Sequence, residues 1–229
     1  MFHDVVGSVG MDIMKYHGLV MMIIVFILSL VGYMGVFLVC GSLKYRHHTQ
    51  WERLEYGWTV LPVILLGFLW GPSMKNLYHM DDVKIPEWNF KSVASQWYWN
   101  YEFHLLNQQD FEFQSYMSSE SGSNFSTKGY RLLDVDWRMV VPSWTQINIY
   151  VTSSDVLHSF AIPSLLLKVD AIPGRINQLP CLFKIPGVFY GQCSEICGVN
   201  HTFMPIVVEA VPSKVFFSWL VELTSLTES

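Results

Sequence analysis

Charged side chains are scarce in this sequence of 229 residues. Asp, Glu, Lys and Arg together make up 14% of it, whereas hydrophobic residues make up 51%. So few charges argue against an ordinary soluble protein and indicate a membrane protein. The charges are also uneven, because residues 1–80 carry five basic and four acidic groups and residues 81–229 carry nine and fifteen. We therefore expect residues 1–80 to be a membrane domain and residues 81–229 to be a water-exposed domain.

The N-terminal region does not show the residue pattern of a cleaved secretory signal. Residues 1–15 are mixed in character, with no charged segment leading into a small-residue cleavage site, so we do not expect a cleaved signal peptide. Residues 16–43 lack charge altogether, and about 20 such residues span a bilayer. Residues 56–74 form a second charge-free run. These runs predict a hairpin of two transmembrane helices, at about residues 17–43 and 56–78.

The loop between the two predicted spans is rich in basic residues. Lys44, Arg46 and Arg53 lie there, and short basic loops stay on the cytoplasmic or matrix side of a membrane. The acidic domain is then expected on the opposite side, in the intermembrane space or the periplasm. No cysteine for lipid attachment precedes the first span. We therefore expect the mitochondrial inner membrane rather than a bacterial plasma membrane, with membrane lipid as a partner and no nucleic acid.

Histidine is absent from the interior of both predicted spans. His17, His47, His48 and His79 all fall at the predicted membrane edges. A chain that ligates haem within the membrane needs paired histidines inside its helices. The sequence therefore excludes haem ligation by these spans.

Cysteine is rare as well, but two of the four cysteines fall in one short segment. Residues 191–205 hold Cys193, Cys197, His201 and Met204 within twelve positions. Soft sulfur donors with imidazole favour copper, whereas a structural zinc site has no use for a thioether. Glycines and a proline punctuate the segment, which predicts a compact loop rather than a helix. The alternatives are a disulfide between the two cysteines, or ordinary packing of all four side chains.

A second imidazole is available upstream of this loop. A site for one copper ion needs one Cys, two His and a distant Met, so the additional cysteine suggests a pair of copper ions bridged by both sulfurs. His158 follows the strand-like run 145–151 and can supply the missing imidazole. One backbone carbonyl would complete a set of six donors.

Three motifs together resemble the second subunit of haem-copper cytochrome c oxidases. They are His158-Ser159-Phe160, the turn from Asp170 to Arg175, and the loop 191–205, and the resemblance covers nearly the whole chain in the right order. It implies a binuclear CuA centre whose ligands are His158, Cys193, Glu195, Cys197, His201 and Met204. In this centre the two cysteines bridge and Glu195 contributes its backbone carbonyl. The Glu195 carboxylate would face a magnesium ion at the boundary with the catalytic subunit.

The same resemblance implies electron transfer. Electrons would arrive from cytochrome c, sit on the copper pair and leave through His201 for haem in the catalytic subunit, where oxygen is reduced to water. Alternation in the aromatic run 92–103 would put Trp97, Trp99, Tyr101 and Phe103 on one face of a strand, and such a face is usually core packing. The resemblance instead matches Trp97 to the tryptophan at which electrons arrive. Glu55 matches a glutamate at the mouth of a proton-uptake channel, although an ordinary interfacial charge is the commoner case. The implied partners are the haem-bearing catalytic subunit and other oxidase subunits.

The pattern after residue 81 predicts an all-β domain with a short C-terminal helix. Strand-like runs separated by Pro and Gly turns indicate a sandwich or barrel, and the resemblance implies a cupredoxin-like Greek-key barrel. A polar surface excursion is expected at residues 105–129 and a helix at residues 214–223, which would pack through Val215, Phe216, Trp219 and Leu220. The expected strands cover residues 92–103, 130–141, 145–151, 164–169, 176–183, 188–192 and 203–211.

Acidic side chains of this domain offer a docking face for a basic protein such as cytochrome c. A net negative domain attracts a basic partner at rates that fall with added salt. Scattered carboxylates are otherwise an ordinary solvated face. The candidates for docking are Tyr98, Asp110, Glu112, Asp136 and Asp155.

Two other functions fit parts of the sequence. A quinol oxidase subunit would have the same barrel without copper, but the intact donor set argues against it. A membrane-tethered copper-binding or assembly protein would leave Trp97, Glu195 and the turn from Asp170 to Arg175 without an explanation. Cys181 belongs to no motif, and we expect it to be a buried thiol.

Overall fold

The computed structural model describes residues 4–41, 47, 50–81, 85–104, 110–118 and 130–227. The chain divides into two compact units. One is Met11–Asp81, and the other combines Met1–Gly10 with Asp82–Ser229. The basic residues Lys44 and Arg46 of the predicted loop lie outside the described residues.

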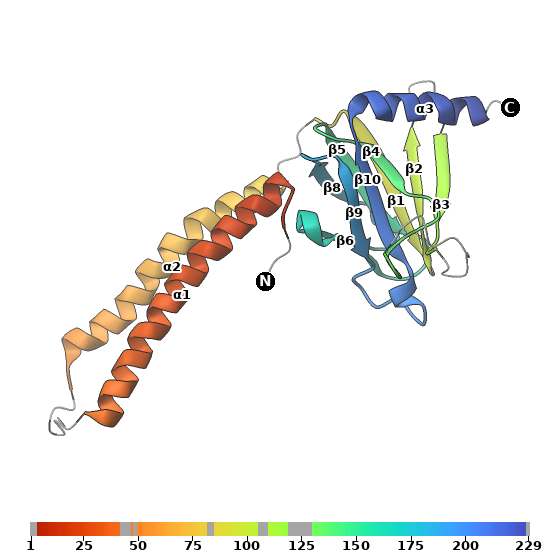
Figure 1. Ribbon diagram of the computed structural model, residues 1–229. Helices are drawn as coiled ribbons and strands as arrows, with labels where there is room; N and C mark the ends of the chain where they lie inside the picture. Colours follow the sequence, from red (N-terminus) through yellow and green to blue (C-terminus); the bar gives the residue numbers. More distant parts are fainter. Residues whose placement is uncertain are drawn as a thin grey trace. The chain divides into compact units, whose positions relative to one another are not determined.

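Two long helices make up the first unit. Helix α1 covers Ser8–Cys40, so it begins before the predicted span 17–43 and ends within it, and α2 covers Glu52–Asp81 and extends beyond the predicted span 56–78 at both ends (Figure 1). Both are long and apolar enough to cross a membrane. They run antiparallel, because Asp12 near the start of α1 contacts His79 near the end of α2, with 3.0 Å between Asp12 Oδ2 and His79 Nδ1. Two apolar helices suited to a membrane hairpin are therefore present, as predicted.

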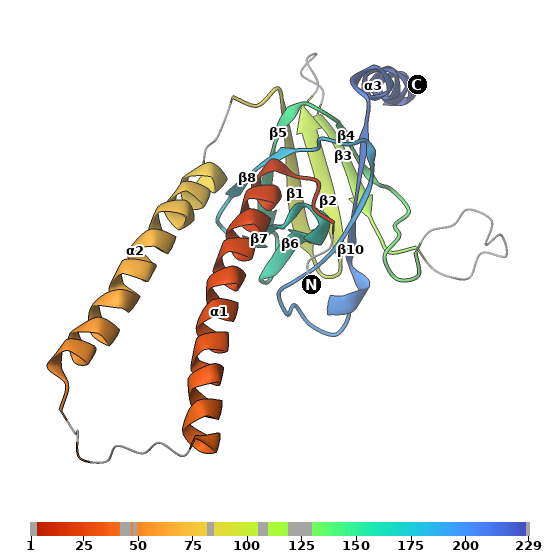
Figure 2. The same cartoon turned by 60° about the vertical axis from the view of Figure 1, so that its left-hand side comes forward.

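The second unit is built from strands in three sheets. The sheet orders are β3-β2-β1-β5-β8, β4-β10-β9 and β6-β7, and Figure 2 shows these strands wrapped around one interior. The all-β prediction is confirmed, but no hydrogen-bonded ladder joins the three sheets of the described chain into a closed barrel. The elements are β1 (Trp88–Ser95), β2 (Tyr98–His104), β3 (Asp110–Ser115), β4 (Met139–Pro142), β5 (Gln146–Ser153), β6 (His158–Ile162), η1 (Pro163–Leu165), β7 (Leu167–Ala171), β8 (Asn177–Leu182), β9 (Gly187–Gln192), η2 (His201–Phe203), β10 (Pro205–Val211) and α3 (Ser213–Thr227).

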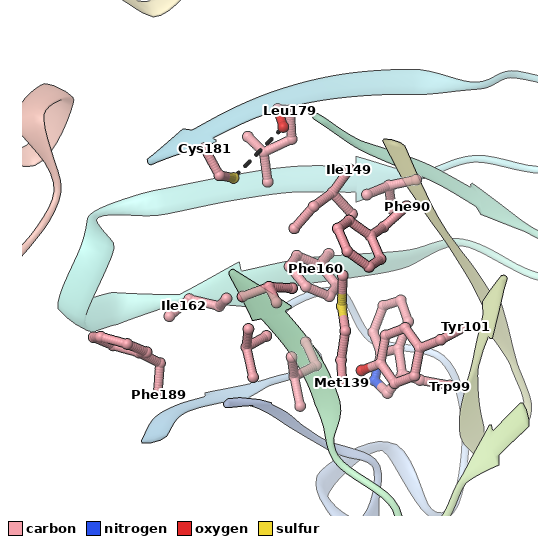
Figure 3. Packing of buried hydrophobic residues seen from close by; sticks show 14 of the residues in the cluster. Phe90, Trp99, Tyr101, Met139, Ile149, Phe160, Ile162, Leu179, Cys181 and Phe189 are labelled. Atoms are coloured by element: carbon pink, nitrogen blue, oxygen red, sulfur yellow. Dashed lines mark hydrogen bonds between the residues drawn. The ribbon is translucent and has the colours of Figure 1, made fainter. Parts of the chain in front are cut away.

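Alternating aromatic residues fill the interior of this unit. Trp99, Tyr101 and Phe103 on β2 are all buried, which confirms the predicted core face, and Trp99 packs edge-on against Phe160 at 5.4 Å between ring centroids. Figure 3 shows Trp99 and Tyr101 lying beside Met139 in this interior. It also shows Cys181 with its Sγ directed at the Leu179 carbonyl oxygen, 3.5 Å away. Cys181 is a buried free thiol, as expected.

Several predicted elements differ from the observed ones. The run 92–103 is not one strand, because Gln96 and Trp97 form the turn between the antiparallel strands β1 and β2. The excursion predicted at 105–129 contains the edge strand β3. The strand predicted at 164–169 begins as η1 and becomes extended only in β7.

Two further differences concern the strand predicted at 130–141 and the packing face of α3. Most of the strand predicted at 130–141 is turn, bend or irregular chain, since the Asp134 and Asp136 carboxylates accept hydrogen bonds from the backbone N–H groups of Tyr116, Val135 and Trp137, which a sheet would otherwise use. The predicted packing face of α3 also shifts by part of a turn. Phe216 and Leu220 are buried as predicted, but Val215 is 52% exposed and Leu223 is buried.

Candidate metal centre

Two segments far apart in the sequence form the candidate metal centre. His158 is the first residue of β6, and its side chain is fully buried. The remaining donors lie in the loop between β9 and β10, where Gly198 has a φ of 124° that favours glycine. A backbone hydrogen bond of 3.1 Å from Ser194 N–H to the Ser159 carbonyl joins the segments. The loop is compact, as predicted, and contains only one short helical turn, η2.

The predicted donor atoms follow one another in a continuous series of contacts. His158 Nδ1 lies 3.8 Å from Cys193 Sγ, which lies 3.9 Å from Cys197 Sγ. On the far side, Cys197 Sγ lies 3.4 Å from His201 Nδ1 and 3.6 Å from Met204 Sδ. Donor atoms of His158, Cys193 and Cys197 all lie within 4.8 Å of one another. Both cysteines are free thiols, so the alternative of a disulfide is not what the structure shows.

The sixth predicted donor also faces the sulfur pair. The backbone carbonyl oxygen of Glu195 accepts a hydrogen bond from Cys193 Sγ at 3.4 Å. The structure thus collects two thiols, two imidazole nitrogens, one thioether and one carbonyl oxygen. This soft and intermediate donor set fits copper and does not fit the hard cations that prefer oxygen ligands.

The two thiols have different acidities. Burial raises the pKa of Cys193, but hydrogen bonds with His158 and with backbone groups of Glu195 and Ser159 outweigh burial and lower the pKa below its ordinary value. Burial and the neighbouring charge of Cys193 raise the pKa of Cys197. One thiolate therefore forms readily, and a second needs compensating positive charge. A bound metal cation supplies such charge.

Three side chains hold the donors in place, and sequence reasoning did not assign this role to them. Asp155 Oδ1 contacts His158 Nε2 at 2.9 Å, which leaves the other ring nitrogen facing Cys193. Trp99 Nε1 donates to the Met204 carbonyl oxygen at 3.2 Å, and Gln96 Nε2 donates to the Cys197 carbonyl oxygen at 2.8 Å. A carboxylate three residues before a histidine ligand was the one available signal, since such partners orient metal-bound histidines.

Trp97 lies directly beside the metal loop. A Cβ placed on Gly198 would lie 3.2 Å from Trp97 Cζ2, so the indole packs against the backbone that follows Cys197. The Trp97 ring is half-buried, and its buried Nε1 has no hydrogen-bond partner among the described residues. The neighbouring Tyr98 stacks on Tyr116 with 4.8 Å between ring centroids.

The other predicted residues belong to β3, to the segment before β4 and to helix α2. Glu112 is exposed on β3 and accepts a hydrogen bond from Asn100, and exposed Asp136 binds backbone N–H groups. Asp110 begins β3, but its side chain lies outside the described part. Glu55 is exposed in the first turn of α2. Their predicted roles in docking and proton uptake remain predictions.

Both parts of the chain match models of one protein family. A model described as the periplasmic domain of cytochrome C oxidase subunit II matches residues 88–211, and a model of the transmembrane domain of the same subunit matches residues 1–76. The chain belongs to the cytochrome c oxidase subunit II family. It is a subunit of a haem-copper oxidase, and its His/Cys/Cys cluster fits the copper site of this family.

Animal proteins are among the similar members of the subunit II family. Cytochrome c oxidase subunit 2 of Mytilus edulis is 52% identical over 96% of this chain and 95% of its own length. The Drosophila subobscura protein is 47% identical over 90% of this chain and 88% of its own length. The crystal structure of the periplasmic domain of subunit II from Bradyrhizobium japonicum has a TM-score of 0.56 and 41% identity, and covers 62% of this chain and 97% of that one.

Proposed function

We propose that this chain binds a pair of copper ions and relays electrons from cytochrome c to haem in the catalytic subunit, where oxygen is reduced to water. The observation that carries this proposal is the unbroken series of donor contacts from His158 through both cysteines to His201 and Met204. When bound, a copper pair supplies a carrier for one electron. The protein supplies donors that are held in place before the metal binds.

The arrangement of donors favours a pair of ions over a single one. The two thiols lie in the middle of the series, and each has its own imidazole, His158 beside Cys193 and His201 beside Cys197. Bridging cysteines with one histidine at each end would satisfy two ions almost symmetrically. Met204 and the Glu195 carbonyl would complete the set as weaker ligands.

Rigid support for the donors suits one-electron transfer, because little reorganisation is needed when charge changes. Asp155 and Trp99 fix the orientation of His158 and the backbone at Met204, and both Cys193 and Met204 are buried. Trp97 is the proposed point of electron arrival, since its ring contacts the residue that follows Cys197. Cytochrome c would dock over Tyr98 and the carboxylates of Asp110, Glu112, Asp136 and Asp155.

Family membership supports further assignments that we propose for this chain. Residues 1–80 form the membrane anchor and contact lipid, and residues 81–229 form the electron-transfer domain. The Glu195 carboxylate binds magnesium at the boundary with the catalytic subunit, and Glu55 lies at the mouth of a proton-uptake channel. The similarity to animal proteins favours the mitochondrial inner membrane, with the β unit in the intermembrane space.

Copper binding by the full chain in detergent tests the proposal. After copper addition and removal of excess metal, we expect two copper ions per chain and an unpaired electron shared equally by two copper nuclei in the electron-spin spectrum. Cys197→Ser should abolish the shared signal, whereas Cys181→Ser should keep it, because Cys181 is a buried thiol outside the centre. One copper with a localised spin would mean a single-ion site. A folded chain that binds no copper would overturn the proposal.

A further inference from the structure

The two strands that carry the metal donors belong to different sheets. Strand β6 begins with His158 and pairs with β7, whereas β9 leads into Cys193 and pairs with β10. Within the described chain, no β-ladder joins β6 to β9. Their separation is therefore set by packing, together with the bond from Ser194 N–H to the Ser159 carbonyl.

At Gly191 the backbone of β9 comes close to the backbone of β6. A Cβ placed on this buried residue would overlap the carbonyl oxygen of Ala161 and lie 3.3 Å from Ile206 Cβ. The obstruction on the β6 side is backbone, so it cannot be relieved by a change of rotamer. Gly191 is not in the left-handed region. The requirement for glycine here is one of space, as it is wherever two backbones approach closely.

We propose that Gly191 is a positioning residue, whose missing side chain sets the distance between the His158 imidazole and the Cys193 thiol. Gly191 lies two residues before Cys193, and Ala161 lies three residues after His158, so both ends of the contact connect directly to donors. The proposal rests on the function proposed above. It adds that strand spacing, and not only the ligands, defines the centre.

The effect of Gly191 should be confined to one side of the centre. Cys197, His201 and Met204 belong to the same loop, which is held internally by bonds from His201 N–H to Gly198 O and from Phe203 N–H to Asn200 O. These contacts do not cross between β6 and β9. Separating the strands should therefore move His158 away from the cysteines and leave His201 in place.

The first measurement uses the metal-free full chain in detergent. In Gly191→Ala, amide hydrogen exchange at Ser194 should become about tenfold faster, because the bond to Ser159 is weakened. Gly187→Ala is the control for added backbone strain in the same strand, since Gly187 has a φ of 157° that disfavours alanine but nothing lies within 4 Å of an added Cβ, so β9 is not pushed away from β6. Unchanged Ser194 exchange in folded Gly191→Ala would overturn the proposal.

The second measurement uses the copper-loaded chain. Gly191→Ala should still bind two copper ions, but the unpaired electron should be shared unequally, whereas Gly187→Ala should retain equal sharing. In a His158→Ala background, adding Gly191→Ala should cause no further spectral change. A further change as large as that seen with His158 present would overturn the proposal, since Gly191 would then act by general loosening. If no variant binds copper, the proposed function fails, and Ser194 exchange still decides the role of Gly191.

A rescue variant covers the case in which Gly191→Ala does not fold. Adding Ala161→Gly gives the obstructing carbonyl more conformational freedom, so the double variant should fold and show intermediate Ser194 exchange. If this variant also fails to fold while Gly187→Ala folds, Gly191 is required for the fold itself, and the specific positioning role is overturned.

Discussion

The helical unit and the β unit use the same apolar side chains in opposite ways. Phe26 and Leu28 on α1 are 67% and 64% exposed in the chain alone, whereas Phe160 and Ile162 on β6 are fully buried. No described residue of α2 is buried. The β unit therefore contains its own apolar interior, and the hairpin depends on lipid or partner subunits for an apolar environment.

The largest change in unfolding free energy should come from removing a phenylalanine ring from the β core, compared with removing one from helix α1. Phe160→Ala should cost about 3–5 kcal/mol of unfolding free energy, because it leaves a cavity in the β core. Phe26→Ala should leave unfolding of the β unit unchanged. Urea unfolding of each full-length variant in detergent, followed by near-ultraviolet circular dichroism, measures both. Equal losses would show that the β unit does not have an independent core.

The next effect contrasts a charge in α1 with a charge on α3. Leu28→Arg should oppose insertion of the first span by about 3 kcal/mol, which is the cost of a cation at the centre of a membrane helix. Val221→Arg on α3 should leave insertion unchanged, since Val221 is exposed and lies outside the spans. Resistance of the membrane-bound chain to alkaline extraction measures insertion. Full resistance of Leu28→Arg would contradict the assignment of α1 as a span.

A smaller, pH-dependent effect should appear at the metal centre of the metal-free chain. Burial lowers the pKa of His158, but hydrogen bonds with Cys193 and Asp155 outweigh burial and raise it above its ordinary value of 6.5. The resulting stability is fully present below about pH 6.5 and is lost as the pH rises through the raised pKa. Asp155→Asn should therefore cost about 1 kcal/mol at pH 6 and less at pH 9.

Chemical unfolding at the two pH values tests this dependence. The pKa of the Asp155 carboxyl itself is lowered, since hydrogen bonds with His158 and backbone groups outweigh burial, so Asp155 stays charged at both values. Glu112→Gln is the control, because Glu112 contacts Asn100 and not the metal centre. A cost for Asp155→Asn that is larger at pH 9 than at pH 6 would contradict the prediction.

The smallest effect should come from a surface ion pair of the β unit. Lys91 Nζ lies 2.7 Å from Glu102 Oε2 across strands β1 and β2. Lys91→Gln should cost about 0.5 kcal/mol, and added salt should reduce this difference, since such partly exposed pairs are screened. Thermal unfolding at low and high salt measures it. If Lys91→Gln lost more unfolding free energy than Asp155→Asn loses at pH 6, the predicted order of the two effects would be wrong.

The local sequence pattern predicted the structure correctly where the burial of apolar side chains alone decides it. The charge-free runs predicted both helices. The alternation of Trp97, Trp99, Tyr101 and Phe103 predicted a buried face, which is correct for the last three, whereas Trp97 lies in a turn and is half-buried. The hydrophobic pattern gave a wrong prediction where side chains compete with neighbouring strands for backbone hydrogen bonds. The carboxylates of Asp134 and Asp136 bind backbone N–H groups and convert a predicted strand into turns. The turn at Gln96 and Trp97 contains neither Gly nor Pro, so no turn-favouring residue indicated its position in the sequence.

By itself the sequence determined the class of the molecule and its donor set. Long uncharged runs can be stable only in an apolar solvent, and two thiols, an imidazole and a thioether in twelve positions are an unusual concentration of soft donors. The tertiary structure alone decided how His158 meets this loop. It also decided that Asp155, Gln96 and Trp99 support the donors and that β6 lies against Gly191. These arrangements depend on contacts between distant segments, and distance along the chain carries no information about distance in space until the core has packed.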